Sequence, residues 1–322
     1  MKTCNPLTFK ELYEKDYVRR PEGGNITLWH YTNAEGLMGV VRNDKAERGK
    51  LHFWFTRSDC LNDPSEGTHI MELYYSVCDE MLESGEISKE FYEVIKTAKI
   101  EDDQFIEFLR PDDERGENGN LMVNMACHAY ICSFSFKEDS LDMWRYYSKG
   151  KSGYGLKCDA KLFSGIGAVH AYPVIYDDGE KRKILKELIG DVFCAHHGLE
   201  YQKEDKLRFA IGLIQTVLKR FQFEFKHDCY ASEQEYRFVI YRPIGEAKAE
   251  MSQNGVPELR FRAQGGILVP YVDMTIENGD AFLQEVLISP FIENAFVMDT
   301  TREYLSQCGY DCPIRESQLP VR

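Results

Sequence analysis

The residues best suited to chemistry form the short motif Glu233-Gln234-Glu235-Tyr236-Arg237. If the motif is a strand, alternate side chains share one face, so Glu233, Glu235 and Arg237 point one way and Tyr236 points the other. Two carboxylates and a guanidinium on one face can form an exposed ladder of ion pairs, which is worth little in stability. They can also form a preorganised acidic site. On spacing alone we expect the exposed ladder, because charged strand faces are common.

Two further polar groups stand on predicted strands. His30-Tyr31-Thr32 ends the first strand, and a histidine followed by two hydroxyls can donate hydrogen bonds to a ribose or a phosphate. A lone histidine in such a place more often bonds backbone groups. Ser133 and Ser135 would share one face of a later strand, where half-buried hydroxyls commonly bond a neighbouring strand.

A short predicted helix over 139–147 carries Trp144, Arg145 and Tyr147. The Arg145 guanidinium could clamp an anion through two hydrogen bonds. Core packing alone explains Trp144 and at least one tyrosine. The helix is therefore a candidate ligand wall with an ordinary structural alternative.

Composition limits the classes of function. The chain has 322 residues and a net charge of −14, which argues against general nucleic-acid binding because phosphate contacts need a basic field. No run reaches the roughly 20 apolar residues of a membrane-spanning helix, and the N-terminus lacks a signal peptide, so we expect a cytoplasmic protein without membrane contact. Ten scattered cysteines without C-x-x-C favour reduced thiols, and we expect no bound metal.

The pattern of elements predicts an α+β protein with a mixed or split antiparallel sheet flanked by helices, because strands and helices do not alternate regularly. We expect one compact domain over 1–322, with a polar surface insert at about 84–120 and a helical insert at about 177–227. A capping box at Asp63-Pro64-Ser65-Glu66 predicts the start of a helix. Its apolar stripe would be Ile70, Leu73, Tyr74, Val77 and Met81. The other predicted helices are 33–41, 178–197, 205–225 and 294–307. The predicted strands are 26–32, 51–56, 129–136, 153–159, 235–242, 258–263, 266–272, 284–289 and a short terminal one.

In chain order these motifs resemble an uncharacterised bacterial family catalogued as domain of unknown function 2971. The resemblance covers nearly the whole chain, and the combination is specific although each piece alone is weak. It rests on His30-Tyr31-Thr32, Asn62-Asp63-Pro64-x-Glu66, Ser133-Phe134-Ser135, Met143-Trp144-x-x-Tyr147 with Gly153, Glu233-x-Glu235-x-Arg237 and the closing segments Ile267-Leu268-Val269-Pro270-Tyr271, Ile288-Ser289-Pro290 and Ser317-Gln318-Leu319-Pro320.

A strand histidine, a serine-aromatic-serine strand and a late E-x-E strand are also more distantly similar to ADP-ribosyltransferases, although Ser-Phe-Ser replaces the Ser-Thr-Ser of that superfamily. The likeness implies NAD as a substrate, Glu235 as the catalytic carboxylate and Glu233 as the residue that orients the acceptor. Breaking the nicotinamide glycosidic bond develops oxocarbenium-like charge, which a fixed carboxylate stabilises. The residues expected to line the NAD site are His30, Tyr31, Thr32, Ser133, Ser135, Trp144, Arg145, Tyr147 and Arg237.

We therefore expect an ADP-ribosyltransferase or NAD glycohydrolase that passes ADP-ribose to an unknown macromolecule or to water, in a defence or toxin-like setting. One alternative is a non-catalytic module that binds a nucleotide or a protein and signals. The other is a nuclease or phosphodiesterase that uses Glu233, Glu235 and Asp63 with a divalent metal.

Overall fold

The computed structural model describes most of the chain. The described residues are Leu12, Lys15, Tyr17, 26–61, 69–100, 105–108, 122–125, 127–147, 153–164, Ile166, 169–198, 203–243 and 258–320. The capping motif around Asp63 and Pro64, and Gly150, lie outside them.

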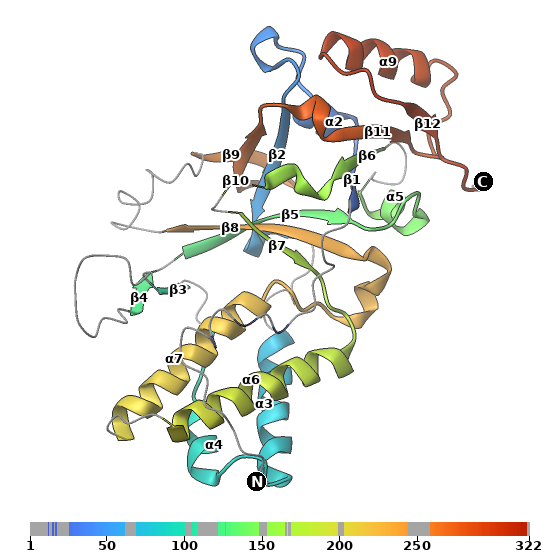
Figure 1. The fold of residues 1–322 in the computed structure, drawn as a ribbon. Coiled ribbons are helices and arrows are strands. Elements are labelled where there is room, and N and C mark those ends of the chain that lie inside the picture. Colours follow the sequence, from blue (N-terminus) through green and yellow to red (C-terminus); the bar gives the residue numbers. More distant parts are fainter. Residues whose placement is uncertain are drawn as a thin grey trace.

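A ten-stranded mixed sheet forms the centre of the molecule, and a separate pair of strands lies beside it (Figure 1). In the large sheet β11 and β12 run parallel, and every other pair runs antiparallel. Its strands are β1 (Thr27–Thr32), β2 (Leu51–Arg57), β5 (Cys127–Ser135), β6 (Tyr154–Asp159), β7 (Val169–Pro173), β8 (Glu235–Pro243), β9 (Leu259–Gln264), β10 (Ile267–Ile276), β11 (Leu283–Ile288) and β12 (Ile314–Glu316). The separate pair is β3 (Phe105–Phe108) and β4 (Met122–Met125).

The sheet is split along β5. One side of β5 pairs with β8 from Cys127 to Ser135. Its other side is shared, because β2 pairs only near Tyr130 and Ile131 whereas β1 pairs only at Ser135. β1 and β2 are therefore neighbours of the same strand and not of each other in the hydrogen-bonded order. The mixed, open sheet with flanking helices agrees with the predicted α+β class.

The helices gather on two sides of the sheet. In Figure 1, α3, α4, α6 and α7 form one group below the sheet, while α9 lies above it. The α-helices are α2 (Ala34–Val40), α3 (His69–Glu83), α4 (Lys89–Ile95), α5 (Leu141–Tyr147), α6 (Asp178–Gly198), α7 (Lys203–Phe221) and α9 (Val297–Gln307), and the short 3₁₀ helices are η1 (Lys45–Glu47), η2 (Ser58–Cys60), η3 (Ala160–Phe163), η4 (Asp228–Glu233) and η7 (Gly279–Ala281).

The two faces of the sheet bury different clusters. We call one the aromatic face, because Phe53, Phe134 and Phe238 pack there with Phe163 of η3. The opposite face buries Ile131, Tyr172, Val239 and Phe223, next to the helical group. Strand alternation assigns every other residue of β1, β5 and β8 to one of these faces.

The predicted stripe of α3 is confirmed, since its five apolar residues are buried in the core of the helical group. The predicted polar surface insert at 84–120 is wrong where α4 forms. Ser88 caps that helix, and Phe91, Tyr92 and Ile95 are buried. The apolar residues of α4 have the spacing of one helical face, but the charged residues between them made the segment look polar in the sequence. The short strand β7 was not predicted.

Cysteine pairing also differs from the expectation of reduced thiols. Cys194 in α6 is disulfide-bonded. The other described cysteines form no disulfide. In the part of the chain that the structure describes, no helix combines the length and the apolar character needed to cross a membrane.

Candidate functional site

The motif from Glu233 to Arg237 is part of a buried ionic cluster at the junction between the helical group and the sheet. Lys226 Nζ lies 2.7 Å from Glu233 Oε2 and 2.5 Å from Glu235 Oε1. Arg237 donates to both carboxylate oxygens of Glu235, from Nε at 2.8 Å and from Nη2 at 3.1 Å. All four side chains are buried. The exposed ion-pair ladder expected from spacing is therefore wrong.

Glu233 enters this cluster from a turn and not from a strand. It ends η4, and β8 begins only at Glu235. Between them Gln234 adopts a left-handed backbone with φ of 42°. We expected Glu233 and Glu235 on one face because side chains alternate along a strand, but the two residues do not belong to one strand. Instead, both carboxylates contact Lys226.

Neighbouring groups hold the cluster in place. The Ser135 hydroxyl donates to the Glu233 carbonyl at 2.6 Å and accepts from the Lys137 amide at 3.0 Å. The Glu235 amide donates to the Tyr176 hydroxyl at 3.0 Å. These bonds fix the turn on either side of Gln234, so both carboxylates are preorganised.

The environments of the two carboxyl groups push their pKa values apart. Burial opposes ionisation of Glu235, but the charges of Arg237 and Lys226 outweigh burial and hold its pKa well below the usual range. Burial, together with the hydrogen bond and charge of Glu235, raises the pKa of Glu233 to about 7. A pair of this kind combines a permanently ionised carboxylate with a group that can exchange a proton near neutral pH.

This titration predicts a pH-dependent stability. The folded protein holds a proton on Glu233 between about pH 4.5 and about 7 that the unfolded chain has released. The free energy of unfolding therefore falls as pH rises through this window. Glu235 contributes in the opposite sense only at lower pH, because its folded pKa is depressed.

Urea unfolding of wild type and Glu233→Gln across the window measures the contribution of Glu233. Other groups titrate in both proteins, so the difference between the two curves isolates it. We expect Glu233→Gln to gain stability relative to wild type as pH rises. A difference that does not change with pH would contradict the raised pKa.

His30 lies away from the carboxylates, on the aromatic face. Its ring packs against Phe53 and Phe134, with ring centroids 5.4 Å and 5.0 Å apart. Ser135 pairs with Glu235, and Phe134 with Tyr236, so the carboxylate of Glu235 belongs to the opposite face. The structure does not bring His30 and Glu235 into one cleft.

The histidine has a structural role at the split in the sheet. His30 Nδ1 donates to the Ser133 carbonyl at 3.1 Å, which lies between the points where β2 and β1 pair with β5. Burial lowers the pKa of His30 to about 4, so the ring is neutral at neutral pH. This is the backbone-bonded arrangement that we had weighed for a lone histidine.

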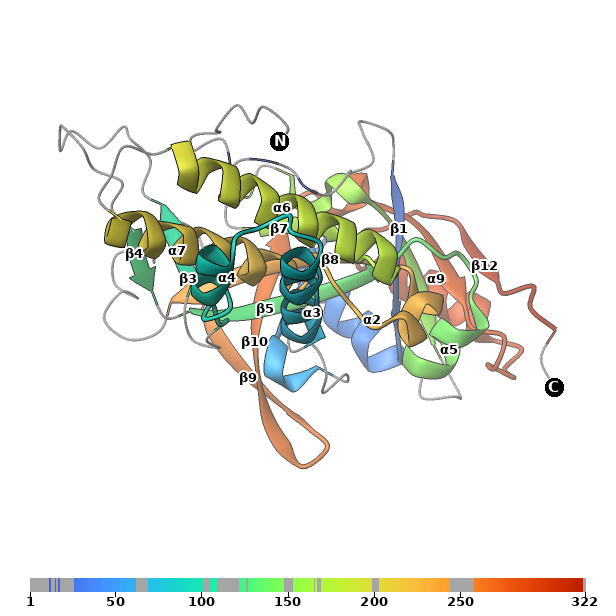
Figure 2. The same cartoon turned by 90° about the horizontal axis from the view of Figure 1, so that it is seen from below.

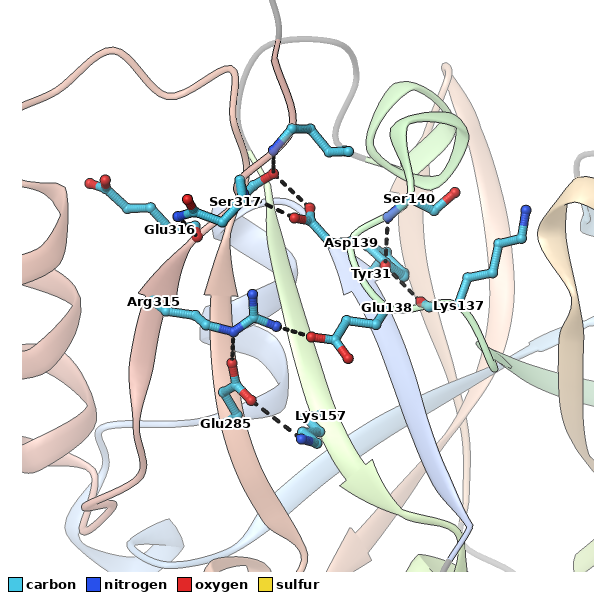
Figure 3. Close-up of polar contacts among 12 residues, drawn as sticks. Tyr31, Lys137, Glu138, Asp139, Ser140, Lys157, Glu285, Arg315, Glu316 and Ser317 are labelled. Atoms are coloured by element: carbon cyan, nitrogen blue, oxygen red, sulfur yellow. Dashed lines mark hydrogen bonds and ion pairs between the residues drawn. The ribbon is translucent and has the colours of Figure 1, made fainter.

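Tyr31 and Thr32 are also held by protein contacts. The Tyr31 hydroxyl donates to the Lys137 carbonyl at 2.8 Å and accepts from the Ser140 amide at 3.3 Å, as Figure 3 shows. Thr32 Oγ1 would lie 1.8 Å from a Cβ on Gly36, so that close contact requires glycine.

The C-terminal segment joins the same region (Figure 3). Asp139, at φ of 48°, accepts from the Ser317 hydroxyl at 2.6 Å and from the Gln318 amide at 3.0 Å. Arg315 binds both Glu138 and Glu285. The chain end is thereby tied to the loop between β5 and α5.

The aromatic helix α5 lies beside η4, the element that carries Glu233. Trp144 is buried, donates to Asp139 from its indole nitrogen at 2.9 Å and meets the Tyr31 ring edge-on at 4.8 Å. Tyr147 is half-buried beside the same cluster. Arg145 is exposed. Core packing thus accounts for Trp144, and Arg145 points away from it.

Two residues of this site were not predicted from sequence. Lys226 lies seven residues before Glu233, and Tyr176 lies much earlier in the chain, but neither stands at a recognisable spacing from the motif. The sequence carried no signal for the burial of Lys226, because Glu224, His227 and Asp228 around it are polar and typical of an exposed segment. Within the described ranges no three His, Cys, Asp or Glu side chains are placed to hold a metal ion.

Comparison with known proteins finds one family model, and that family has no known activity. The model of the family described as protein of unknown function (DUF2971) matches residues 143–238. The match begins within α5 and includes the cluster of Glu233, Glu235 and Arg237, whereas His30 and the C-terminal motifs lie outside it. No curated protein and no solved structure matches the chain. Over residues 143–238, the chain resembles the DUF2971 family of unknown function.

Proposed function

We propose that this protein cleaves the nicotinamide–ribose bond of NAD, as an NAD glycohydrolase or an ADP-ribosyltransferase with an unknown acceptor. The observation that supports it is the buried pair of carboxyl groups, Glu233 and Glu235, which both contact Lys226 Nζ. Their surroundings hold Glu235 ionised and raise the pKa of Glu233 to about 7. Enzymes that break glycosidic bonds commonly use two carboxyl groups whose pKa values differ.

In this proposal each residue has a chemical task. The bond between nicotinamide nitrogen and the ribose carbon breaks with its electron pair leaving on nicotinamide, and positive charge develops on the ribose. The Glu235 carboxylate stabilises that charge. Glu233 accepts a proton from the attacking water or acceptor hydroxyl, so the products are nicotinamide, ADP-ribose or its adduct, and a proton. Arg237 and Lys226 keep Glu235 ionised.

A second candidate is a non-catalytic module that binds a nucleotide or a protein. Two observations favour it. Both oxygens of Glu235 are already bonded by Arg237 and Lys226, and His30 lies on the other face of the sheet. In this case the ionic cluster stabilises the fold, and recognition occurs elsewhere on the surface.

The test is to incubate the purified full chain with NAD and to follow free nicotinamide by chromatography. Catalysis predicts turnover that saturates with NAD, with ADP-ribose appearing in equal amount when water is the acceptor. Saturable NAD binding without nicotinamide release would overturn the enzymatic proposal in favour of the binding module. A parallel incubation with single-stranded nucleic acid and magnesium tests the nuclease alternative, for which Asp63 lies outside the described residues.

A further inference from the structure

A separate feature lies at the far edge of the sheet, on strands β2, β10 and β9. Arg262 of β9 covers two aromatic rings, with its guanidinium carbon 5.3 Å from the Trp54 ring centroid and 5.5 Å from that of Tyr271. The two rings contact each other at 4.9 Å. Figure 2 shows the β9–β10 hairpin extending away from the rest of the molecule. Arg262 is half-buried on this stacked platform.

The hydrogen-bond partners of Arg262 are neutral. Nη2 donates to the Thr56 hydroxyl at 2.9 Å, and Nε donates to the Gln264 side-chain oxygen at 3.3 Å. In the described part of the chain no carboxylate forms an ion pair with Arg262. Burial lowers its pKa, as expected for a desolvated cation without an acid beside it. A guanidinium has five N–H donors, so Arg262 keeps donors for a ligand.

The neighbouring arginines are different. Arg42 Nη2 and Arg260 Nη1 both lie on the buried Asp273 carboxylate, at 2.7 Å and 2.8 Å. Two guanidinium groups therefore share one carboxylate on the part of the sheet that also carries Arg262, although the whole chain has a net charge of −14. The local excess of positive charge favours an anion.

The aromatic platform of Trp54 and Tyr271 is packed tightly, and its indole N–H has no hydrogen-bond acceptor among the described residues. A Cβ on Gly39 would lie 3.2 Å from the Trp54 ring, so α2 packs tightly against the indole. Among the described residues the stacked Arg262 guanidinium forms no ion pair, so this place suits a negatively charged group rich in hydrogen-bond acceptors.

We propose that Arg262, on the platform of Trp54 and Tyr271, is a binding site for a phosphate-bearing ligand. The planar guanidinium fork bonds two phosphate oxygens at once, and stacking on the rings fixes its orientation. Arg42 and Arg260 add favourable charge without direct contact. The site does not depend on NAD cleavage, because it uses none of the residues of the carboxylate cluster.

Calorimetric titration of the full chain with inorganic pyrophosphate at low ionic strength tests the site. We expect saturable binding that Arg262→Gln weakens on the order of 10-fold or more, the size of a lost charged hydrogen-bond pair. Arg260→Gln is the matched control, because it removes the same charge from the same strand and should change affinity far less. Arg262→Lys should fall between wild type and Arg262→Gln, since it keeps the charge and loses the fork.

Several results would overturn the proposal. One is the absence of saturable pyrophosphate binding by wild type. Another is an equal loss of affinity in Arg262→Gln and Arg260→Gln, which would mean diffuse electrostatic attraction. Thermal melting confirms that each variant is folded. If Arg262→Gln does not fold, Arg262→Lys decides the matter, and unchanged binding by that variant contradicts the site.

Discussion

Glu235→Gln should lower nicotinamide release from NAD by at least about two orders of magnitude, the usual cost of removing a group that stabilises transition-state charge. Glutamine keeps the shape of the side chain but removes the negative charge that, in the proposed mechanism, stabilises the ribose. The expected loss is in kcat more than in KM, because the charge matters only once the bond breaks. Steady-state kinetics with NAD measures both constants.

The control for this prediction is a second glutamate that, like Glu235, is bonded by a lysine and an arginine. Glu285 also lies between a lysine and an arginine, since it bonds both Lys157 and Arg315, and it is outside the carboxylate cluster. Glu285→Gln should leave nicotinamide release within a few-fold of wild type. Unchanged release in Glu235→Gln would remove Glu235 from the mechanism. Glu235→Asp, which keeps the charge, distinguishes a lost charge from a disturbed fold if Glu235→Gln melts early.

Arg237→Met should destabilise the protein by about 3–5 kcal/mol, because it leaves the buried Glu235 carboxylate with only Lys226 to compensate it. The side chain of Arg237 is 1% exposed, so water cannot replace the lost partner. The melting temperature should fall on the order of 10 °C. Thermal and urea unfolding followed by circular dichroism measure the change.

The matched control is Arg302→Met, since Arg302 is an exposed arginine that bonds Asp299 in the same helix. Exposed pairs contribute about 0–1 kcal/mol, so its unfolding should hardly change. Combining Glu235→Gln with Arg237→Met should recover part of the stability lost by Arg237→Met alone, because the unpaired buried carboxylate is gone. Equal effects of Arg237→Met and Arg302→Met would mean that the cluster adds little to the fold.

Local sequence determined most of the elements. The apolar spacing of α3, α6 and α7 and the alternation of β1, β5 and β8 were sufficient, because helical and strand periodicities are properties of neighbouring residues. The same reasoning failed for α4, where the charged residues are as many as the apolar ones that pack inward. The sequence also selected Glu233, Glu235 and Arg237 as the principal polar motif.

Only the tertiary structure decided what surrounds that motif. Burial turned an expected surface ladder into an ionic cluster, in which Lys226 from the end of the helical group contacts both carboxylates. Burial and the neighbouring Glu235 raise the pKa of Glu233, whereas the charges of Arg237 and Lys226 lower the pKa of Glu235. The tertiary structure also placed His30 and Glu235 on opposite faces of the sheet. A strand pattern gives alternation but not which face each strand presents to its neighbours, since that depends on register, and a shift of one residue reverses it.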